Sequence, residues 1–524
     1  MKISIFKYIF FVILTILISV AVYILYNNKS KQTIDSQIKR MEFNIIEEFN
    51  IGITEYDTIN PILSNNRDIQ YIDKLIFQSL LDITLDFKIK NLLAKEFSKI
   101  NSTTYIAKLR DDVYWHDGTK FTAKDVLFTV NNLKKDNIKS IYKENVSIIE
   151  EIQQIDNYTI KIVLKEETPF FEYRMCFPIL ASHSYEANSL DSKTVLPIGT
   201  GKYKIESIEE KLIKLVIAND NNDSKVKNVN IVLKKTINEL YNAFSKNEID
   251  YIITDNIEYE KSIGKMGYNV KQICNRKFEY LLFNVNNNIL SNKDIRKVIN
   301  YAINKKTINY NIYNNKYIES IFPLEYGSYL YNNDELNEYS INKMKQILTE
   351  NGWTYKKNIW EKNNKKLEFN LLVNSNNKKR VLLAEEIKEQ LQQVGIKINI
   401  IKVDNNLFEK HIKYKNYDMI LTGNIVSSYP NLETYLGKDN LSNFNNEEIK
   451  NILNDVKNIS DENILTDKYK RIEEIYKEQI PFVGLYFNSL FILSNRNLKG
   501  DLSCNWYNLF YNIDNWYKIQ EDYN

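Results

Sequence analysis

The side chains that could carry out covalent or metal chemistry are few and scattered in this chain of 524 residues. A metal site or a disulfide framework needs closely spaced ligands, and the chain has no HxxxH, HxH or CxxC spacing. It also lacks the GxSxG, HExxH and GxxxxGK[ST] motifs. The isolated histidines and cysteines are His116, His183, His411, Cys176, Cys274 and Cys504. The sequence therefore predicts no catalytic residue, no metal ligand and no cofactor, although its many carboxylates leave a glycosidase-like pair open.

The composition is that of a globular protein without a marked excess of charge. The 70 lysines and arginines nearly balance the 67 acidic residues, so there is no electrostatic case for nucleic-acid binding. Hydrophobic residues make up 44% and charged residues 26%, and the length allows two lobes. Most of the abundant aromatic residues are expected to pack in a core. A ligand cleft would use only a few of them.

An uncharged apolar run, YIFFVILTILISVAVYILY, occupies residues 8–26. A helix of this length crosses most of the roughly 30 Å hydrocarbon layer, and no small-x-small cleavage site follows it. We therefore expect an uncleaved single-pass anchor, with residues 1–40 forming the membrane anchor and tether. Lysines flank the run on both sides, so the positive-inside rule does not fix its orientation.

Strands and helices alternate in the second half of the chain, which predicts an α/β lobe. Period-two patterns at 367–373 and 396–403 flank a helical pattern at 381–394 that Gly395 ends. A crossover helix of that length implies that the two strands pair in parallel. A short apolar strand at 417–421 would join the same covered sheet.

One stretch, KLRDDVYWHDGTKFTAKD at 108–125, carries most information about the kind of protein. It reads as a strand end, a turn and a helix start, in which Thr122 caps the helix three residues before Asp125. The order of its residues closely resembles the LR-x-x-V-x-W/F-x-D-G-x-x-x-T-A-x-D-V segment of the oligopeptide/dipeptide/nickel-type solute-binding proteins (family 5) that serve ABC importers.

Further landmarks of that family recur in the same order along the chain. Residues 72–81 read as the helix that leads into the family's EGL segment. Asn247 replaces a glycine of a family turn, a change that asparagine tolerates because it can adopt the left-handed conformation. The other matching segments lie at 53–61, 92–97, 197–203, 246–250 and 481–486.

The resemblance implies a two-lobed, periplasmic-binding-protein-like (type II) α/β fold with an extra subdomain, preceded by an N-terminal transmembrane helix. Its lobes close around a ligand by a hinge motion. The implied segments are 1–40 for the anchor and tether, 41–65 for the start of lobe I, 66–194 for the extra subdomain, 195–277 for lobe I again, 278–486 for lobe II and 487–524 for the return to lobe I.

The ligand-binding residues are also predicted from the resemblance. Residues 423–430, GNIVSSYP, correspond to the family's G-W-x-x-D-Y-x-D-P, whose backbone groups contact a bound peptide. Arg67 could pair a ligand carboxylate, and Tyr486 lies where the chain crosses between the lobes, as hinge core or cleft wall. The candidate residues are Asn65, Arg67, Gly423, Asn424, Ile425, Ser427, Ser428, Tyr429 and Tyr486.

Ser428 departs from the family at an important position. It stands where the family has the aspartate that clamps a peptide's α-ammonium group, and Asn424 replaces the neighbouring tryptophan, whereas Tyr429 is retained. A serine hydroxyl cannot replace that charge. Either another carboxylate (Glu55, Asp57 or Glu433) binds the ammonium, or the ligand lacks a free N-terminus, or the protein no longer serves transport.

We therefore expect a monomeric, membrane-anchored protein that captures oligopeptides outside the cytoplasm and delivers them to the permease subunits of an ABC importer. The short N-terminal flank and the family resemblance decide the orientation of the anchor, and no cysteine follows it to accept a lipid. The alternatives are a peptide-sensing or non-transport surface binding protein of the same fold, and a surface hydrolase.

Overall fold

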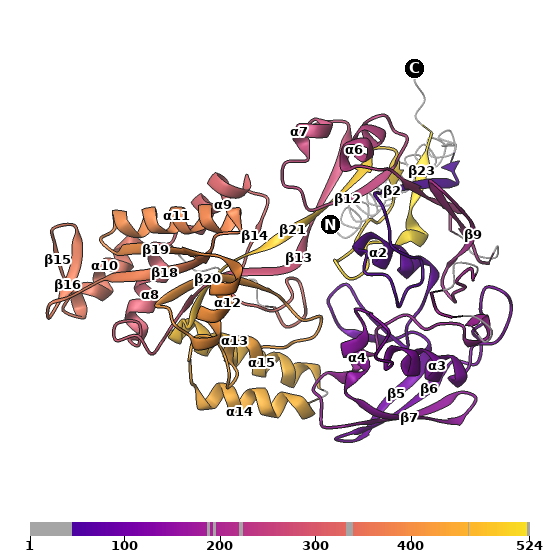
Figure 1. Ribbon diagram of the computed structural model, residues 1–524, viewed down its shortest axis with the longest axis horizontal. Helices are drawn as coiled ribbons and strands as arrows, with labels where there is room; N and C mark the ends of the chain where they lie inside the picture. Colours follow the sequence, from indigo (N-terminus) through magenta and orange to yellow (C-terminus); the bar gives the residue numbers. More distant parts are fainter. Residues whose placement is uncertain are drawn as a thin grey trace, which may run out of the picture.

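The computed structural model describes residues 45–185, 189–191, 195–219, 224–331, 339–459 and 461–520. Two α/β lobes share one sheet of 11 strands (Figure 1). The strand order is β19-β18-β20-β13-β21-β12-β2-β11-β10-β9, and β14 pairs with β21 off this path. The long antiparallel strands β13 (Tyr268–Phe283) and β21 (Phe482–Asn495) run from one lobe into the other. The predicted two-lobed α/β fold is confirmed.

Lobe I lies on one side of the two crossing strands. β2 pairs in parallel with β11 and β12, whereas β9, β10 and β11 follow one another in antiparallel order. Phe49 of β2 and Trp516 near the C-terminus are fully buried in one core, so the chain returns to this lobe at its end. The elements are β1 (Ile45–Ile46), β2 (Glu48–Ile53), α2 (Arg67–Ile76), β9 (Tyr203–Glu209), β10 (Leu212–Ile217), β11 (Asn228–Leu233), α6 (Ile237–Ser245), β12 (Tyr251–Thr254), α7 (Glu260–Ile263), β22 (Leu498–Lys499) and β23 (Tyr517–Ile519).

Lobe II lies on the other side and has a hydrophobic core on each face of its sheet. β18 pairs in parallel with both β19 and β20, which confirms the predicted crossover. The elements are α8 (Lys293–Ala302), α9 (Lys305–Tyr313), β14 (Ile318–Glu319), α10 (Ile341–Glu350), β15 (Thr354–Lys356), β16 (Ile359–Lys362), β17 (Lys365–Lys366), β18 (Glu368–Asn374), α11 (Lys378–Gln393), β19 (Lys397–Val403), α12 (Asn405–Tyr414), β20 (Met419–Ile425), α13 (Glu433–Leu436), α14 (Glu447–Asp455) and α15 (Glu462–Gln479).

A separate core forms the subdomain that contains the informative stretch at 108–125. Thr122 N donates to Asp125 Oδ2 at 2.9 Å, as the predicted cap requires, and Trp115 is buried with its Nε1 donating to the same carboxylate at 3.3 Å. Trp115 is therefore a packing residue. The elements are β3 (Leu81–Ile83), β4 (Ile89–Asn91), β5 (Ala94–Asn101), β6 (Thr104–Leu109), α3 (Ala123–Leu133), α4 (Lys143–Ser147), β7 (Ile149–Asp156), β8 (Thr159–Leu164) and α5 (Phe171–Arg174).

The first helix differs from the prediction of 72–81, because α2 spans Arg67–Ile76. Asn66 caps it by accepting from the backbone N–H groups of Asp68 and Ile69. The helix ends at Ile76, whose carbonyl accepts from Gly201 N at 2.8 Å. A β-carbon on Gly199 would lie 1.8 Å from the same oxygen, so this close approach requires glycine.

The buried face of α2 packs in the core of lobe I. The predicted division of the chain at residues 66, 195, 278 and 487 stays a prediction.

The expected strand at 417–421 also differs, because β20 continues to Ile425. Gly423, Asn424 and Ile425 pair with Glu279, Phe278 and Lys277 of β13. These residues were expected in a ligand-contacting loop. The apolar pattern ends at Leu421, but the ladder to β13 continues because the long crossing strand offers partners beyond that point.

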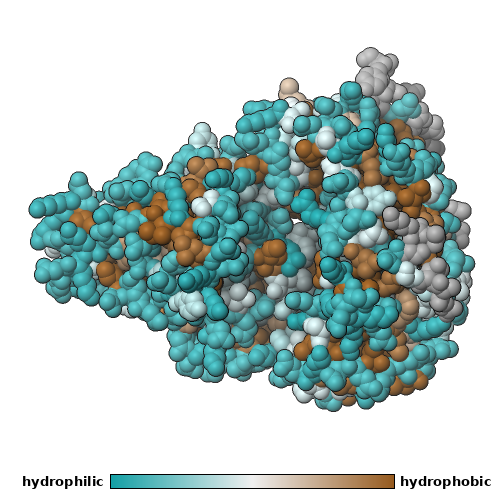
Figure 2. All heavy atoms as spheres, viewed as in Figure 1, coloured by the Kyte–Doolittle hydropathy of each residue, from teal (hydrophilic) through white to brown (hydrophobic). Residues whose placement is uncertain are grey.

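The predicted anchor at residues 8–26 lies outside the described residues. Within the part of the chain that the structure describes, no helix combines the length and apolar character needed to cross a membrane. Hydrophilic residues cover most of the face in Figure 2, where hydrophobic residues form separate patches.

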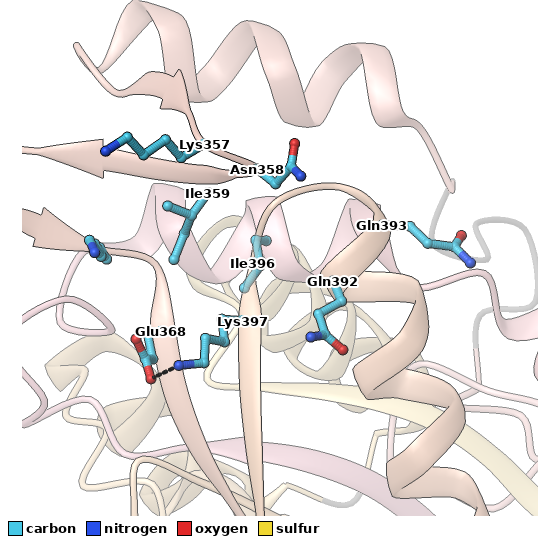
Figure 3. Close-up of a pocket in the computed structure, with 9 residues that line it drawn as sticks. Lys357, Asn358, Ile359, Glu368, Gln392, Gln393, Ile396 and Lys397 are labelled. Carbon is cyan, nitrogen blue, oxygen red and sulfur yellow. Dashed lines mark ion pairs between the residues drawn. The ribbon is translucent and has the colours of Figure 1, made fainter.

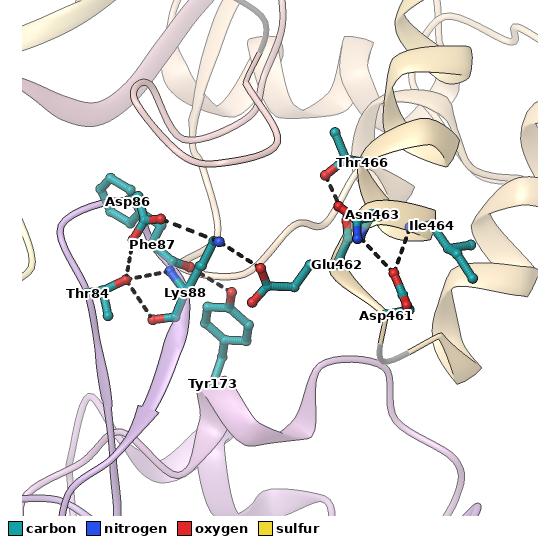
Figure 4. A network of polar contacts seen from close by, with 10 residues as sticks. All are labelled: Thr84, Asp86, Phe87, Lys88, Tyr173, Asp461, Glu462, Asn463, Ile464 and Thr466. Atoms are coloured by element: carbon teal, nitrogen blue, oxygen red, sulfur yellow. Dashed lines mark hydrogen bonds and ion pairs between the residues drawn. The ribbon is translucent and has the colours of Figure 1, made fainter.

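The subdomain touches lobe II in this structure (Figure 4). Lys88, on the β3–β4 hairpin, forms a 2.6 Å ion pair with Glu462 in the first turn of α15. Tyr329 N donates to Asp86 O of the same hairpin at 3.0 Å. The lobes therefore meet at this edge, in addition to their connection through β13 and β21.

Candidate ligand-binding cleft

A cavity of about 400 Å³ lies where the lobes meet. The crossing strands β13 and β21 contribute to its lining, together with the end of β12, the end of α9 and the start of α11. Asp255 and Asn256 line it from lobe I, and Asn377, Lys379 and Arg380 line it from lobe II. Its volume falls within the usual range for small-molecule sites, and both lobes contribute polar groups to it.

An ion pair fixes the wall of the cavity on the side of lobe II. Arg380 donates through Nε to Glu279 Oε2 at 2.8 Å and through Nη2 to Glu279 Oε1 at 3.1 Å. The same Nη2 lies 3.3 Å from Gly423 O. A β-carbon on Gly423 would lie 2.7 Å from both Arg380 Nη2 and Glu279 Cδ, so glycine is needed beside the pair.

Three tyrosines form the aromatic part of the cavity. Tyr313 and Tyr317 stack with ring centroids 4.1 Å apart, and the hydroxyls of Tyr313 and Tyr486 are hydrogen bonded. Burial raises the pKa of all three hydroxyls, so they stay protonated and neutral at physiological pH. They provide apolar surface with a few polar atoms, which suits an amphipathic ligand.

Positive charge predominates at the start of α11. Asn377 caps this helix of 16 residues by accepting from Arg380 N, and the unpaired N–H groups of a helix start favour an anion. Lys277 and Lys379 line the same cavity. On the opposite wall Asp255 accepts from Arg67 at 3.1 Å. The cavity can therefore accept a ligand with both an anionic end and polar backbone groups.

The structure places one of the predicted residues in the lining of this cavity and two others in contact with lining residues. Tyr486 lines it directly, Gly423 contacts the Arg380–Glu279 pair, and Arg67 reaches it through Asp255. Tyr486 is only 2% exposed and packs in a hydrophobic core, and it also lines the cavity. It therefore belongs both to the hinge core and to the cleft wall.

The other predicted residues lie elsewhere. Tyr429 packs against Phe170 and Tyr173 of the subdomain, with ring centroids 6.3 and 6.5 Å apart, and Ser427 and Ser428 precede it in the same half-buried loop. Asn424 and Ile425 are part of β20, and the Ile425 side chain is 69% exposed.

Asn65 also lies away from the cavity lining. Its backbone N–H donates to Asp57 Oδ2 at 2.6 Å. The Asp57 carboxylate also accepts from Ser64 Oγ and Thr58 N. Of the carboxylates that could replace the missing aspartate, Asp57 is thus engaged in its own loop, whereas Glu55 and Glu433 are exposed.

A second cavity, of about 520 Å³, lies in lobe II beside the β15–β16 turn and the end of α11, and Figure 3 shows the residues that line it. Its wall includes Lys357 and Asn358 of the β15–β16 turn and the ion pair between Lys397 and Glu368, 2.7 Å apart. All of its lining residues belong to lobe II. It is a weaker candidate for ligand binding.

Of the isolated histidines, His116 has a structural role. His116 Nδ1 accepts from Gly199 N at 3.1 Å, and its Nε2 lies 2.9 Å from Gly201 O, so the imidazole holds the turn that ends α2. Within the described residues, no group of three or more His, Cys, Asp or Glu side chains could hold a metal ion.

Sequence reasoning missed the polar groups of the cavity. Glu279 carried one usable signal, because it is a single charge inside the otherwise apolar and aromatic run from Phe278 to Phe283. Arg380 stands among other cations at the start of its helix and has no such signal. Tyr313 and Tyr317 are two of 37 tyrosines.

Two α/β lobes joined by two long strands, with a polar and aromatic cavity between them, define a two-lobed binding protein. The family model for bacterial extracellular solute-binding proteins, family 5 middle region, matches residues 88–446. The chain belongs to this family.

Relatives cover nearly the whole chain. The oligopeptide-binding protein AppA of Bacillus subtilis (strain 168) is 22% identical over 500 residues, which is 89% of this chain and 90% of AppA. The unliganded open form of the periplasmic murein tripeptide-binding protein MppA has a TM-score of 0.79 at 17% identity, over 92% of this chain and 99% of MppA. NikZ from Campylobacter jejuni, in complex with Ni(L-His), has a TM-score of 0.60 at 22% identity, over 90% of this chain and 99% of NikZ. These structures establish the fold.

Family 5 proteins are extracytoplasmic substrate-binding components of ABC importers that bind peptides or nickel. The homologues are solute-binding proteins and not enzymes, and the same holds for this chain.

Proposed function

We propose that this protein captures oligopeptides between its two lobes and delivers them to the permease subunits of an ABC importer. The observation that carries the proposal is the interlobe cavity, which combines a tyrosine wall, a helix start with lysines beside it, and acidic groups on both lobes. A peptide has matching features, namely an extended polar backbone with charged ends. The cavity includes Tyr486, which was predicted as a ligand contact.

The proposed contacts retain all nine predicted residues. The outer edge of β20 supports a role for the backbone of Gly423, Asn424 and Ile425, since β18 pairs only with Met419 and Ile420 of that strand. A peptide could add to this edge beyond the contact of Arg380 with Gly423 O, as extended ligands do at exposed sheet edges. The complete set is Asn65, Arg67, Gly423, Asn424, Ile425, Ser427, Ser428, Tyr429 and Tyr486.

Binding is tested with the purified extracytoplasmic part of the chain. Mass spectrometry of what co-purifies identifies a retained ligand, and peptide pools are then screened by thermal shift, because a ligand that binds only the folded state raises Tm by mass action. Saturable binding of peptides without turnover is expected. Hydrolysis of the peptide would favour the surface hydrolase. No change in Tm with any peptide pool would exclude oligopeptides as the solute.

We also propose that residues 8–26 anchor a monomeric protein to the membrane with the large domain outside. The length and apolar character of this run support the anchor. Protease added to intact protoplasts should digest the large domain, and sedimentation of the soluble part should give the mass of one chain. Protection from the protease would contradict this orientation.

A peptide sensor, or a surface binding protein without a transport role, is the second candidate. It is favoured by Ser428, which replaces the aspartate that clamps a peptide's ammonium group in the family. Deletion of the gene separates the two functions, because loss of peptide uptake indicates transport and loss of a peptide response with normal uptake indicates sensing.

A further inference from the structure

Arg276 occupies an irregular part of the crossing strand β13. The ladder to β21 is interrupted between Cys274 and Phe278, so the residues between them do not pair with β21. Arg276 O accepts from Val426 N at 2.9 Å, and Arg276 Nε donates to Val426 O at 2.8 Å. Its neighbours Asn275 and Lys277 line the interlobe cavity. Cys274 and Phe278 pack in the core on the other face of the sheet, so the Arg276 side chain lies on the face opposite that cavity, toward the loop that follows Val426.

Trp506 lies beneath the Arg276 guanidinium, which stands 4.5 Å from the indole centroid. The indole stacks on Phe87 of the β3–β4 hairpin, with centroids 5.9 Å apart. The preceding residue, Asn505, donates to Thr84 O of that hairpin at 3.0 Å. Trp506 is thus held on the side of lobe I and the subdomain, and its N–H can only donate a hydrogen bond.

Glu325 reaches this pair from lobe II, where neighbouring residues pack in the lobe II core. Its Oε2 accepts from Trp506 Nε1 at 2.8 Å. Its Oε1 is buried without a hydrogen-bond partner and lies 3.8 Å from Arg276 Nε. The side chain is 6% exposed, and burial raises the pKa of this carboxyl to about 8.

Arg276 is the charged group that faces Glu325. The nearby Cys274 and Tyr435 are kept neutral, because burial raises the pKa of both groups. The hydrogen bond of Arg276 to Val426 O uses Nε. The Nη groups of Arg276 make no hydrogen bond to any of the described residues. Trp506 therefore donates to one oxygen of the carboxyl, whereas the Arg276 guanidinium only faces the other oxygen and keeps its Nη groups for another acceptor.

We propose that Arg276 and Trp506 form a carboxylate-binding site, that Glu325 fills it when the lobes meet without a solute, and that a carboxylate of the solute displaces Glu325. The proposal rests on the proposed function, and it assigns the solute an accessible carboxylate, such as a peptide C-terminus or an acidic side chain. A free carboxylate could turn to accept from the Nη groups, which Glu325 does not do from its fixed position on lobe II.

The site is tested first with acetate, which needs no knowledge of the solute. Glu325→Ala removes a CH₂ and a carboxyl group, leaving space the size of acetate. Acetate should raise the Tm of this variant and change its tryptophan fluorescence, with an affinity roughly tenfold or more above that of the neutral isostere acetamide. In Glu325→Gln the amide still fills the site, so neither compound should bind there.

The matched control removes the cation in the same background. Glu325→Ala/Arg276→Met should lose the preference for acetate over acetamide. Equal response to the two compounds in Glu325→Ala, or an unchanged preference after Arg276→Met, would overturn the proposal.

A second measurement does not depend on the folding of Glu325→Ala. The unmodified protein should bind a peptide acid roughly tenfold or more tightly than the C-terminal amide of the same peptide, and Arg276→Met should abolish that difference. Acid and amide binding equally well, with no acetate effect, would refute the carboxylate site but leave peptide binding intact. Failure of all peptides, with acetate still bound by Glu325→Ala, would refute the oligopeptide function alone.

Discussion

Arg380 and Glu279 form a two-point ion pair beside the interlobe cavity, with contacts of 2.8 and 3.1 Å. Glu279 belongs to the strand that crosses between the lobes, and Arg380 lies in the first turn of α11. Their side chains are only 5% and 12% exposed. The pair therefore ties the helix start that faces the cavity to the hinge between the lobes.

Removing one partner of this pair should be strongly destabilising. Arg380→Met leaves the buried Glu279 carboxylate without its two-point partner and with only the more exposed Lys277, 3.7 Å away. We expect a loss of about 3 kcal/mol in the free energy of unfolding, measured by urea denaturation. Arg380→Met/Glu279→Gln should recover much of that loss, because no uncompensated charge remains. Lys450→Met, which breaks an exposed helix pair with Glu447, should change stability little. A small effect of Arg380→Met would contradict the buried position of the pair.

The contact between Lys88 and Glu462 should influence how far the lobes open. Both side chains are partly exposed, so Lys88→Glu should leave Tm nearly unchanged. The new repulsion acts across the edge where the subdomain meets lobe II, and we expect a larger radius of gyration by small-angle X-ray scattering. High salt should reduce the difference. Lys450→Glu provides the matched control within lobe II. Identical scattering of Lys88→Glu and the unmodified protein would count against closure through this contact.

The half-buried His116 should make the protein less stable in acid. Burial lowers the pKa of this imidazole, so the unfolded chain takes up the proton more readily than the folded chain. Its stabilising contribution is therefore complete above the unfolded-state pKa of about 6.5 and is lost as the pH falls through the lower folded-state value. A protonated ring also could not accept from Gly199 N.

The measurement is the change in Tm between about pH 7.5 and pH 5. His116→Gln should show a smaller loss of Tm over this range than the unmodified protein. The control, His411→Gln, replaces a histidine in the last turn of α12. It should lose as much Tm over this pH range as the unmodified protein. The same loss in His116→Gln and the unmodified protein would show that another group controls the acid response.

Sequence patterns correctly predicted the parts of the fold that depend on residues close together in the chain. The cap between Thr122 and Asp125, the parallel crossover around α11 and the left-handed turn at Asn247 all follow from such patterns. The errors arose where distant segments decide. α2 ends at Ile76 because the turn at Gly199 and Gly201 packs against its last carbonyl, a contact that sequence spacing does not reveal.

The candidate site was less predictable than the fold for the same reason. Tyr486 was found through its place in a family motif, but the ion pair of Glu279 and Arg380 joins residues 101 positions apart. Glu325 and Trp506 are separated by 181 positions and come from different lobes. Family resemblance shows where a loop lies in the sequence. It does not show which distant side chains, such as Glu325 and Trp506, come into contact, because that depends on how the lobes pack together.

Restoring a carboxylate in the loop after β20 tests its alignment with the family. Ser428 is half-buried and precedes Tyr429, which packs on the subdomain. If Ser428 occupies the position of the family's ammonium clamp, Ser428→Asp should strengthen binding of peptides with a free N-terminus by about 1.5–3 kcal/mol, or roughly 10- to 100-fold in Kd. N-acetylated versions of the same peptides should gain nothing, since they carry no ammonium charge.

Titration calorimetry with each peptide pair measures this difference. Ser427→Asp adds the same charge one residue earlier, outside the position matched to the family's aspartate, so it should not reproduce the discrimination between free and acetylated peptides. Equal gains for the two kinds of peptide in Ser428→Asp would indicate general electrostatic attraction. No gain in either would mean that the ammonium group binds elsewhere, with the exposed Glu55 and Glu433 as the next carboxylates to replace.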